Sequence, residues 1–186
     1  DSFARLGGFP VGVAANDGQK GGGAMTADGA RKFRRFLETC QTFGLPVLAL
    51  CDEPGFMIGI EAEEAGTIRA GTAAVMAAHT CAVPWCTLVV RKAYGVAAMA
   101  HFGGEDATVL AWPSAEVGTL PVESGVAVAF GREIAASADP DAARAARAPS
   151  ARRAAASRRR RCRATRVPRS CATAACGASA CSARAS

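Results

Sequence analysis

The turn Arg91-Lys-Ala-Tyr-Gly95, which runs into Val96 and Ala97, is the segment of this sequence best suited to chemistry. An apolar run, Trp85–Lys92, precedes it, and an Ala-rich stretch, residues 96–101, follows it. If the first is a strand and the second a helix, the amides of Val96 and Ala97 are first-turn donors that lack an intrahelical acceptor. Such donors can hold a negatively charged oxygen, although an ordinary helix N-terminus has the same pattern.

A second segment of this kind lies earlier, where the apolar run Leu48–Cys51 breaks into Pro54-Gly-Phe56. Asp52 and Glu53 open this loop. They could act as an acid and base pair, but carboxylates at a strand end more often accept hydrogen bonds from loop amides, and we favour that role.

A hydrolase triad is the main catalytic alternative from side chains. Ser114, Ser124, His79 and His101 could contribute to one, but no Gly-x-Ser-x-Gly elbow presents either serine. We expect His101 to be a surface or helix-terminal residue. The three glycines at 21–23 lack the ending of a phosphate-binding loop, so a flexible loop is expected there.

The elements that would position these segments alternate along the chain. Short β-type runs occur at residues 10–16, 45–52, 85–92 and 107–113, with helical patterns between the first three, which predicts an α/β fold. The first helix is expected to begin at Asp28 and end at Gly44, and its apolar face is Phe33, Phe36, Leu37, Cys40 and Phe43. A second helix is expected over Glu63–His79, with Gly66 and Gly71 tolerated for close packing.

Charge is distributed unevenly along the chain. Residues 1–143 contain 10 Lys and Arg residues and all 16 acidic residues, a net charge of −6. Residues 144–186 contain 12 Arg and no acidic residue, and they have too few large apolar side chains to form a core. We expect disorder here, or a gene read out of frame from residues 143–149. A nucleic-acid-binding arm is disfavoured, because no aromatic residue is interleaved for stacking.

The eight Cys residues show no disulfide framework or metal-binding spacing. Cys40, Cys51, Cys81 and Cys86 lie in or beside apolar runs, as small hydrophobic residues do. No secretory signal opens the chain and no apolar run is long enough to span a bilayer. We therefore expect a protein of the cytoplasm, or of the mitochondrial matrix in a eukaryote. The first residue, Asp1, suggests a piece of a longer protein.

Several motifs in residues 8–141 occur together in one known family. They are Pro10-Val-Gly-Val-Ala-Ala-Asn16, Cys51-Asp-Glu-Pro-Gly-Phe-Met57, Arg91-Lys-Ala-Tyr-Gly95 and Ala111-Trp-Pro113. In this combination the chain resembles the C-terminal half of the carboxyltransferase β subunit of biotin-dependent acyl-CoA carboxylases, of the propionyl-CoA carboxylase β type. The resemblance implies a crotonase-like (ClpP/crotonase) ββα spiral over residues 1–141, with residues 142–186 as a basic low-complexity tail.

The same resemblance implies a function in acyl-CoA and fatty acid metabolism: transfer of a carboxyl group from carboxybiotin to an acyl-CoA. Backbone amides of Val96 and Ala97, beside Gly95, would form the oxyanion hole, without a metal ion. Substrate or biotin would contact Gly55, Phe56, Tyr94 and Met99. The partners would be a biotin carboxylase or biotin carrier subunit, and a homo-oligomer that contains the N-terminal carboxyltransferase half.

Two departures from the family leave other functions open. Many relatives have Gly-Gly-Ala-Tyr-Asp where this chain has Gly95-Val-Ala-Ala-Met99. Because Val96 replaces a glycine, the oxyanion hole requires a negative φ at Val96. Because Met99 replaces the acidic residue, the acyl group is not predicted. A crotonase-type hydratase, isomerase or decarboxylase would need a glutamate in the pocket, for which Glu53 and Glu61 are the candidates. A truncated, inactive domain that binds partner subunits is the third alternative.

Overall fold

A computed structural model describes residues 1–147. Its strands are β1 (Ser2–Leu6), β2 (Phe9–Ala15), β3 (Val47–Glu53), β4 (Trp85–Tyr94), β5 (Thr108–Ala111) and β6 (Glu116–Gly118). Its helices are a 3₁₀ turn (Gly21–Gly23), α1 (Ala27–Thr42), α2 (Ile60–Glu64), α3 (Thr67–Thr80), α4 (Gly95–Met99) and α5 (Val122–Ala135). The four predicted strands are confirmed as β2 to β5, whereas β1, β6 and α5 were not predicted.

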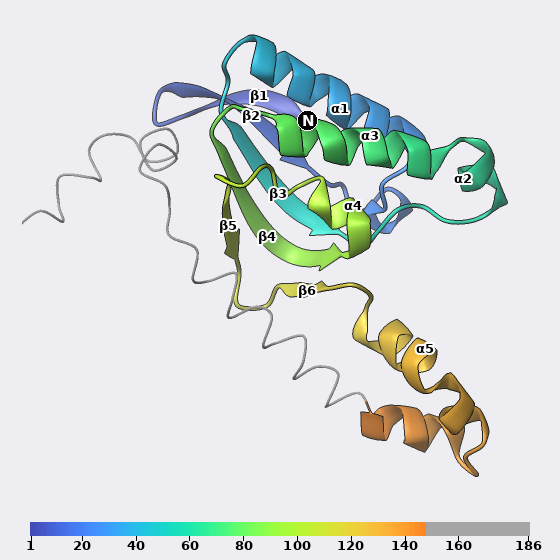
Figure 1. Cartoon of the computed structure of the whole chain (residues 1–186). Helices are drawn as coiled ribbons and strands as arrows, with labels where there is room; N and C mark the ends of the chain where they lie inside the picture. The colour runs from blue at the N-terminus through green and yellow to red at the C-terminus, as the bar shows by residue number, and fades with distance from the viewer. Residues whose placement is uncertain (148–186) are drawn as a thin grey trace, which may run out of the picture.

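The sheet has the order β1-β2-β3-β4-β5, and β6 pairs with the end of β4 (Figure 1). β1 and β2 form an antiparallel hairpin, and all other pairs are parallel. β4 changes partner along its length: Cys86–Val89 pair with β5, and Lys92–Tyr94 pair with β6. Within one sheet, β4 therefore exchanges β5 for β6 as its neighbour shortly before α4 begins.

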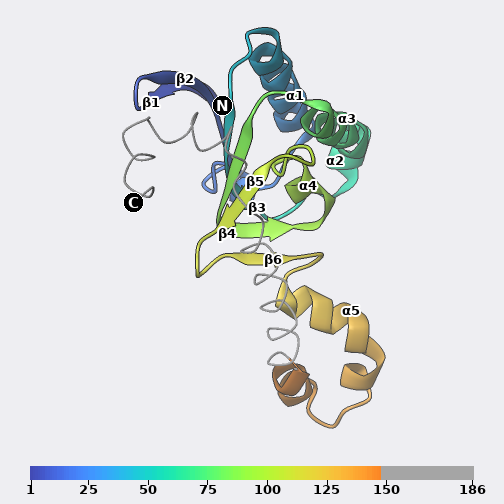
Figure 2. The same ribbon diagram turned by 60° about the vertical axis from the view of Figure 1, so that its left-hand side comes forward.

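α1 and α3 lie side by side on one face of the sheet (Figures 1 and 2). Of the apolar face predicted for α1, Phe33, Phe36, Leu37 and Cys40 are buried, but Phe43 is 72% exposed because it already belongs to the helix end. Leu45 N–H bonds to the carbonyl of Cys40 across a left-handed Gly44, which is a Schellman ending and confirms the predicted stop.

The predicted start of α1 is wrong by two residues. Thr26, not Asp28, is the N-cap, and its hydroxyl accepts a hydrogen bond from Gly29 N–H. Asp28 lies in the first turn and pairs with Arg31 on the surface. Both residue types suit an N-cap, so the sequence could not choose between them.

The helix predicted over Glu63–His79 is two helices. Gly66 has φ 72°, in the left-handed region, which ends α2 and begins α3 in a new direction. Gly71 has the close contact expected of it, since a Cβ at this position would lie 2.3 Å from the ring of Phe56. The residues of α3 that pack inward are small: Thr67, Gly71, Ala74 and Ala78.

β3 was expected to be covered on both faces, and it is covered fully on one. Val47, Ala49, Cys51 and Glu53 are buried, whereas residues 48, 50 and 52 between them are partly exposed. Val47 and Ala49 belong to the main core together with residues of α1 and α3, whereas Cys51 belongs to a second cluster with Ala98 of α4. The other face of β3 has no helix of residues 1–147 packed on it (Figure 2).

α5 extends away from the sheet in both views (Figures 1 and 2). Residues 140–147 are also helical and return along it, with Arg147 bonded to Glu133 and stacked on Phe130. Within residues 1–147 no helix is both long enough and apolar enough to cross a membrane. The predicted tail lies outside the described residues except for 142–147, so its disorder and the boundary at residue 141 stay predictions.

Candidate functional site

The turn between β4 and α4 is a glycine corner that leads directly into the first turn of a helix. Gly95 has φ 63°, so only glycine is comfortable at this corner. Glycine is the only residue type with positive φ in residues 1–147, so Val96 meets the condition of a negative φ. The amides of Val96 and Ala97 lie in the first helical turn, and no loop, cap or side chain of the described residues supplies them with an acceptor.

The surroundings of these amides are open on one side and packed on the other. Val96 is 57% exposed and Met99 is 42% exposed, whereas Ala97 is fully buried. Tyr94, predicted to contact substrate or biotin, is buried, and its hydroxyl donates a hydrogen bond to Glu116 on β6. Tyr94 therefore anchors the start of α4, while Val96 and Met99 remain accessible to a ligand.

The Pro54-Gly-Phe56 loop is held by contacts within the chain. Gly55 N–H donates to Glu53 Oε1 at 3.0 Å, and the Gly55 carbonyl accepts from Met25 N–H. The ring of Phe56 packs on Gly71 of α3. Gly55 and Phe56, both predicted to contact substrate or biotin, thus have structural contacts of their own.

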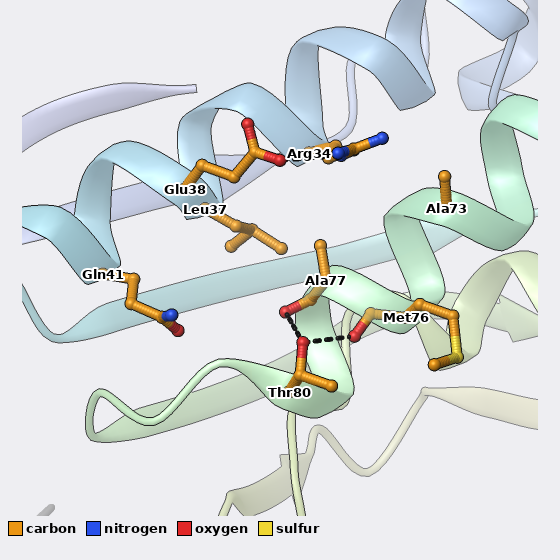
Figure 3. Close-up of a pocket in the computed structure, with 8 residues that line it drawn as sticks. All are labelled: Arg34, Leu37, Glu38, Gln41, Ala73, Met76, Ala77 and Thr80. Atoms are coloured by element: carbon orange, nitrogen blue, oxygen red, sulfur yellow. Dashed lines mark hydrogen bonds and ion pairs between the residues drawn. The ribbon is translucent and has the colours of Figure 1, made fainter.

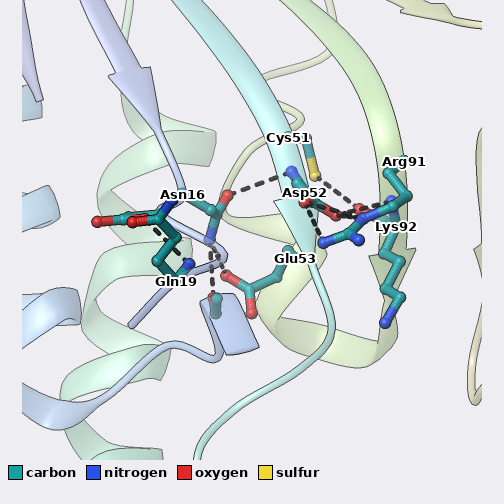
Figure 4. A network of polar contacts seen from close by, with 9 residues as sticks. Asn16, Gln19, Cys51, Asp52, Glu53, Arg91 and Lys92 are labelled. Atoms are coloured by element: carbon teal, nitrogen blue, oxygen red, sulfur yellow. Dashed lines mark hydrogen bonds and ion pairs between the residues drawn. The ribbon is translucent and has the colours of Figure 1, made fainter. Parts of the chain in front are cut away.

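Asp52 and Glu53 accept backbone hydrogen bonds, as predicted, and do not form an acid and base pair (Figure 4). Asp52 accepts from Lys92 N–H at 3.1 Å and from Arg91 through both Nε and a terminal nitrogen. This hydrogen bond raises the pKa of the Arg91 guanidinium. The pair ties the end of β3 to β4 three residues before the turn, which fixes the position of Gly95.

Asn16 joins the end of β2 to the same region. Its Nδ2 donates to Glu53 Oε2 at 2.8 Å and to the carbonyl of Gly23, and its Oδ1 accepts from Asp52 N–H. The three contacts are visible as dashed lines around Asn16 in Figure 4. The carboxyl ends of β2, β3 and β4 are thereby held together beneath α4.

His101 was expected to be a surface or helix-terminal residue. It lies just after the end of α4, but it is not on the surface, because it is only 3% exposed. Its Nε2 lies 3.4 Å from Glu53 Oε2, and its ring lies against Phe33 with centroids 5.2 Å apart. This pairing could not be predicted, because Glu53 and His101 are far apart in the chain and meet only when α4 folds over the end of β3.

Other features of the described residues do not belong to this site. A groove of about 370 Å³ lies between α1 and α3, walled by Arg34, Glu38, Met76 and Thr80, and no predicted site residue lines it (Figure 3). Burial raises the pKa of the Cys51 thiol to about 12 and that of Cys40 to about 11, so neither is a reactive thiolate. No group of three or more metal-ligating side chains occurs in residues 1–147.

Comparison with known proteins decides the family. The family model described as the carboxyl transferase domain matches residues 2–170. The chain belongs to the carboxyl transferase domain family. The methylmalonyl-CoA carboxyltransferase 12S subunit of Propionibacterium freudenreichii subsp. shermanii is 40% identical over 147 residues, which are 77% of this chain and 28% of that protein. The methylmalonyl-CoA decarboxylase subunit alpha of Propionigenium modestum is 38% identical over 143 residues, 75% of this chain and 28% of that protein.

A solved structure of the family shares the fold. The crystal structure of the transcarboxylase 12S hexamer, with methylmalonyl-CoA and methylmalonic acid bound, matches with a TM-score of 0.76 at 36% identity over 82% of this chain and 30% of that one. The predicted crotonase-like α/β class is therefore confirmed. This carboxyl transferase domain spans less than a third of the length of the relatives it matches.

Proposed function

We propose that this chain is the biotin-binding half of an acyl-CoA carboxyltransferase, in which the amides of Val96 and Ala97 hold the ureido oxygen of biotin. The observation that carries the proposal is the turn itself: two N–H donors without an acceptor in the described residues, beside a glycine corner and next to an exposed Val96. Neutral N–H donors suit an oxygen that gains negative charge, because they stabilise it without a proton transfer.

Carboxybiotin on its carrier would supply the carboxyl group, and the amides of Val96 and Ala97 would stabilise negative charge on its ureido oxygen. The residues of this chain contribute rigidity. Asp52 fixes Lys92, and Tyr94 is fixed through Glu116, so the strand that leads to the turn is held from both sides. Donors held in this way need no reorganisation during the reaction, which is the main source of their catalytic value.

The acyl-CoA site and the partners are further parts of the proposal. The related 12S structure is a hexamer with methylmalonyl-CoA bound, and this chain covers 30% of that protein. We infer that the remaining part of the relatives' length, from the same or another subunit, binds the acyl-CoA against this half. Exposed apolar residues around α2 and α4 suit such a contact: Ile58, Ile60, Val96, Met99 and Leu120.

The crotonase-type hydratase is less well supported by the structure. Its glutamate would have to be free to exchange protons with substrate, but Glu53 is fully buried and accepts N–H bonds on both oxygens. Glu61 is exposed on α2. A decarboxylase that uses the same amides stays a second candidate, because the Propionigenium modestum relative is a methylmalonyl-CoA decarboxylase subunit.

Carboxylation assays test the proposal. The chain alone, with free biotin as acceptor and methylmalonyl-CoA as carboxyl donor, is expected to form no carboxybiotin and propionyl-CoA, whereas addition of the N-terminal half of a related carboxyltransferase should restore this transfer. Val96→Pro removes one N–H at a first-turn position that tolerates proline, and should lower the restored rate by about 10² to 10³. Val96→Ala keeps the amide and is the matched control. Equal rates for the two variants would refute the role of this amide.

A further inference from the structure

The imidazole of His101 has a partner on only one of its two nitrogens. Nε2 lies 3.4 Å from Glu53 Oε2, but Nδ1 has no hydrogen-bond partner in the described residues, although the side chain is almost fully buried. Buried polar atoms without a partner are rare in folded proteins, and each one calls for an explanation such as a bound water or ligand.

The contacts of Glu53 determine which nitrogen of His101 carries the proton. Oε1 accepts from Gly55 N–H and Oε2 accepts from Asn16 Nδ2, so both carboxylate oxygens are acceptors. The third contact, from His101, is then a donated Nε2–H. A neutral imidazole with this proton presents the lone pair of Nδ1, so the unpartnered atom is an acceptor that needs a donor.

His101 also lines a cavity of about 560 Å³ beside the 3₁₀ turn. Asn16, Gly21, Phe33 and Met57 contribute to its wall, whereas Glu53 does not. Because Nε2 is engaged by Glu53, Nδ1 is the ring nitrogen left for a ligand in this cavity.

The charges at this cavity have a small positive excess. Asp1, Asp17, Lys20 and Lys32 line it, and all four are exposed, and the terminal ammonium group of Asp1 adds a third positive charge. A positive excess disfavours a cationic hydrogen-bond donor, so a neutral donor suits Nδ1 better. Gly21 and Gly23 of the 3₁₀ turn line the wall, and without side chains their backbone can approach a ligand closely.

We propose that Nδ1 of His101 accepts a hydrogen bond from the N–H of a neutral amide or ureido group bound in this cavity. The inference rests on the proposed function, which brings two sources of this chemistry to the chain: the ureido ring of biotin and the amides of the pantetheine arm of CoA. Nδ1 is covered in the free chain. The ligand reaches it by a small displacement of the wall, whose movable parts are the glycines of the 3₁₀ turn and the flexible Met57 side chain.

The full chain contains only two His residues, which makes a direct test possible. With ¹⁵N-labelled histidine, NMR resolves two imidazoles, and His79, exposed at the end of α3, is the internal reference. In the free chain His101 should show a protonated Nε2 and an unprotonated Nδ1. A proton on Nδ1 would overturn the proposal, because that atom would then be a donor.

Titration with biotin and, separately, with pantetheine identifies the source. The expected result is a saturable shift of the His101 Nδ1 resonance with one of them, in the direction of hydrogen-bond acceptance, while His79 does not move. No response to either ligand would overturn the proposal. The amide signals of Val96 and Ala97 in the same samples distinguish the proposed function from the role of His101. If these amides respond to biotin but His101 responds to neither ligand, the proposed function stands and only the role of His101 is refuted.

Substitution gives a second readout. His101→Phe keeps a ring against Phe33 but removes the acceptor, and should weaken binding of the responding ligand at least about fivefold, the order expected for a lost hydrogen bond. His79→Phe is the matched control and should bind as the unaltered chain does. Equal affinities of the two variants would contradict the proposal. If His101→Phe does not fold, the spectra of the unaltered chain still decide.

Discussion

Cys51 shows how burial sets the chemistry of a single residue in this domain. Its thiol is fully buried and donates a weak hydrogen bond to the carbonyl of Lys92. Desolvation raises its pKa from 9.0 to about 12. A nucleophilic role is therefore excluded at neutral pH, and the residue acts as a small core side chain, as its place in an apolar run predicted.

This raised pKa predicts a stability change at alkaline pH. Below pH 9 the thiol is protonated in both states and has no effect, but between pH 9 and 12 only the unfolded chain loses the proton. The free energy of unfolding should then fall by about 1.4 kcal/mol per pH unit from this group. Urea unfolding of the unaltered chain and of Cys51→Ala, from pH 8.5 to 11, should give a shallower decline for the variant. Parallel declines would contradict the assignment.

At the scale of elements, the sequence predicted those with a strong local pattern. α1, β3 and β4 have clear periodicity or long apolar runs and were found at the expected places. β6 has three residues and β1 is largely exposed, so neither carries such a signal. The burial of His101 depends on tertiary contacts, which no local pattern contains, whereas the break at Gly66 had a local signal, a glycine able to adopt positive φ.

The packing of α3 on the Pro54-Gly-Phe56 loop gives a prediction at this scale. Gly71→Ala would place a methyl group 2.3 Å from the Phe56 ring, so the ring and loop must move. The expected cost is about 1–3 kcal/mol in the free energy of unfolding, measured with urea. Gly125→Ala in α5 is the control, since a methyl group there meets nothing within 4 Å and should be neutral or stabilising. Equal stability of the two variants would show that the contact is absent.

At the scale of the whole molecule, this chain contains the turn and the strands that hold it, and it matches less than a third of each relative. The relatives are more than three times as long as the part matched here. One sheet face without a helix of residues 1–147 and the exposed apolar residues near α4 are consistent with a chain that packs against further protein. The family could be recognised from the motifs because they lie at the strand ends that build the turn. The acyl group of the substrate could not be predicted from the sequence, because the proposed acyl-CoA contacts lie outside this chain.

The central claim is that the peptide N–H groups after Tyr94 bind a single ligand oxygen. The most direct measurement is a ¹H–¹⁵N NMR titration of the chain with biotin, which records every amide at once. The account predicts that the amide protons of Val96 and Ala97 shift downfield together with one dissociation constant, and that Val96→Pro abolishes the shift at Ala97 while Val96→Ala preserves it. Unchanged amide signals at both residues under saturating biotin would contradict it.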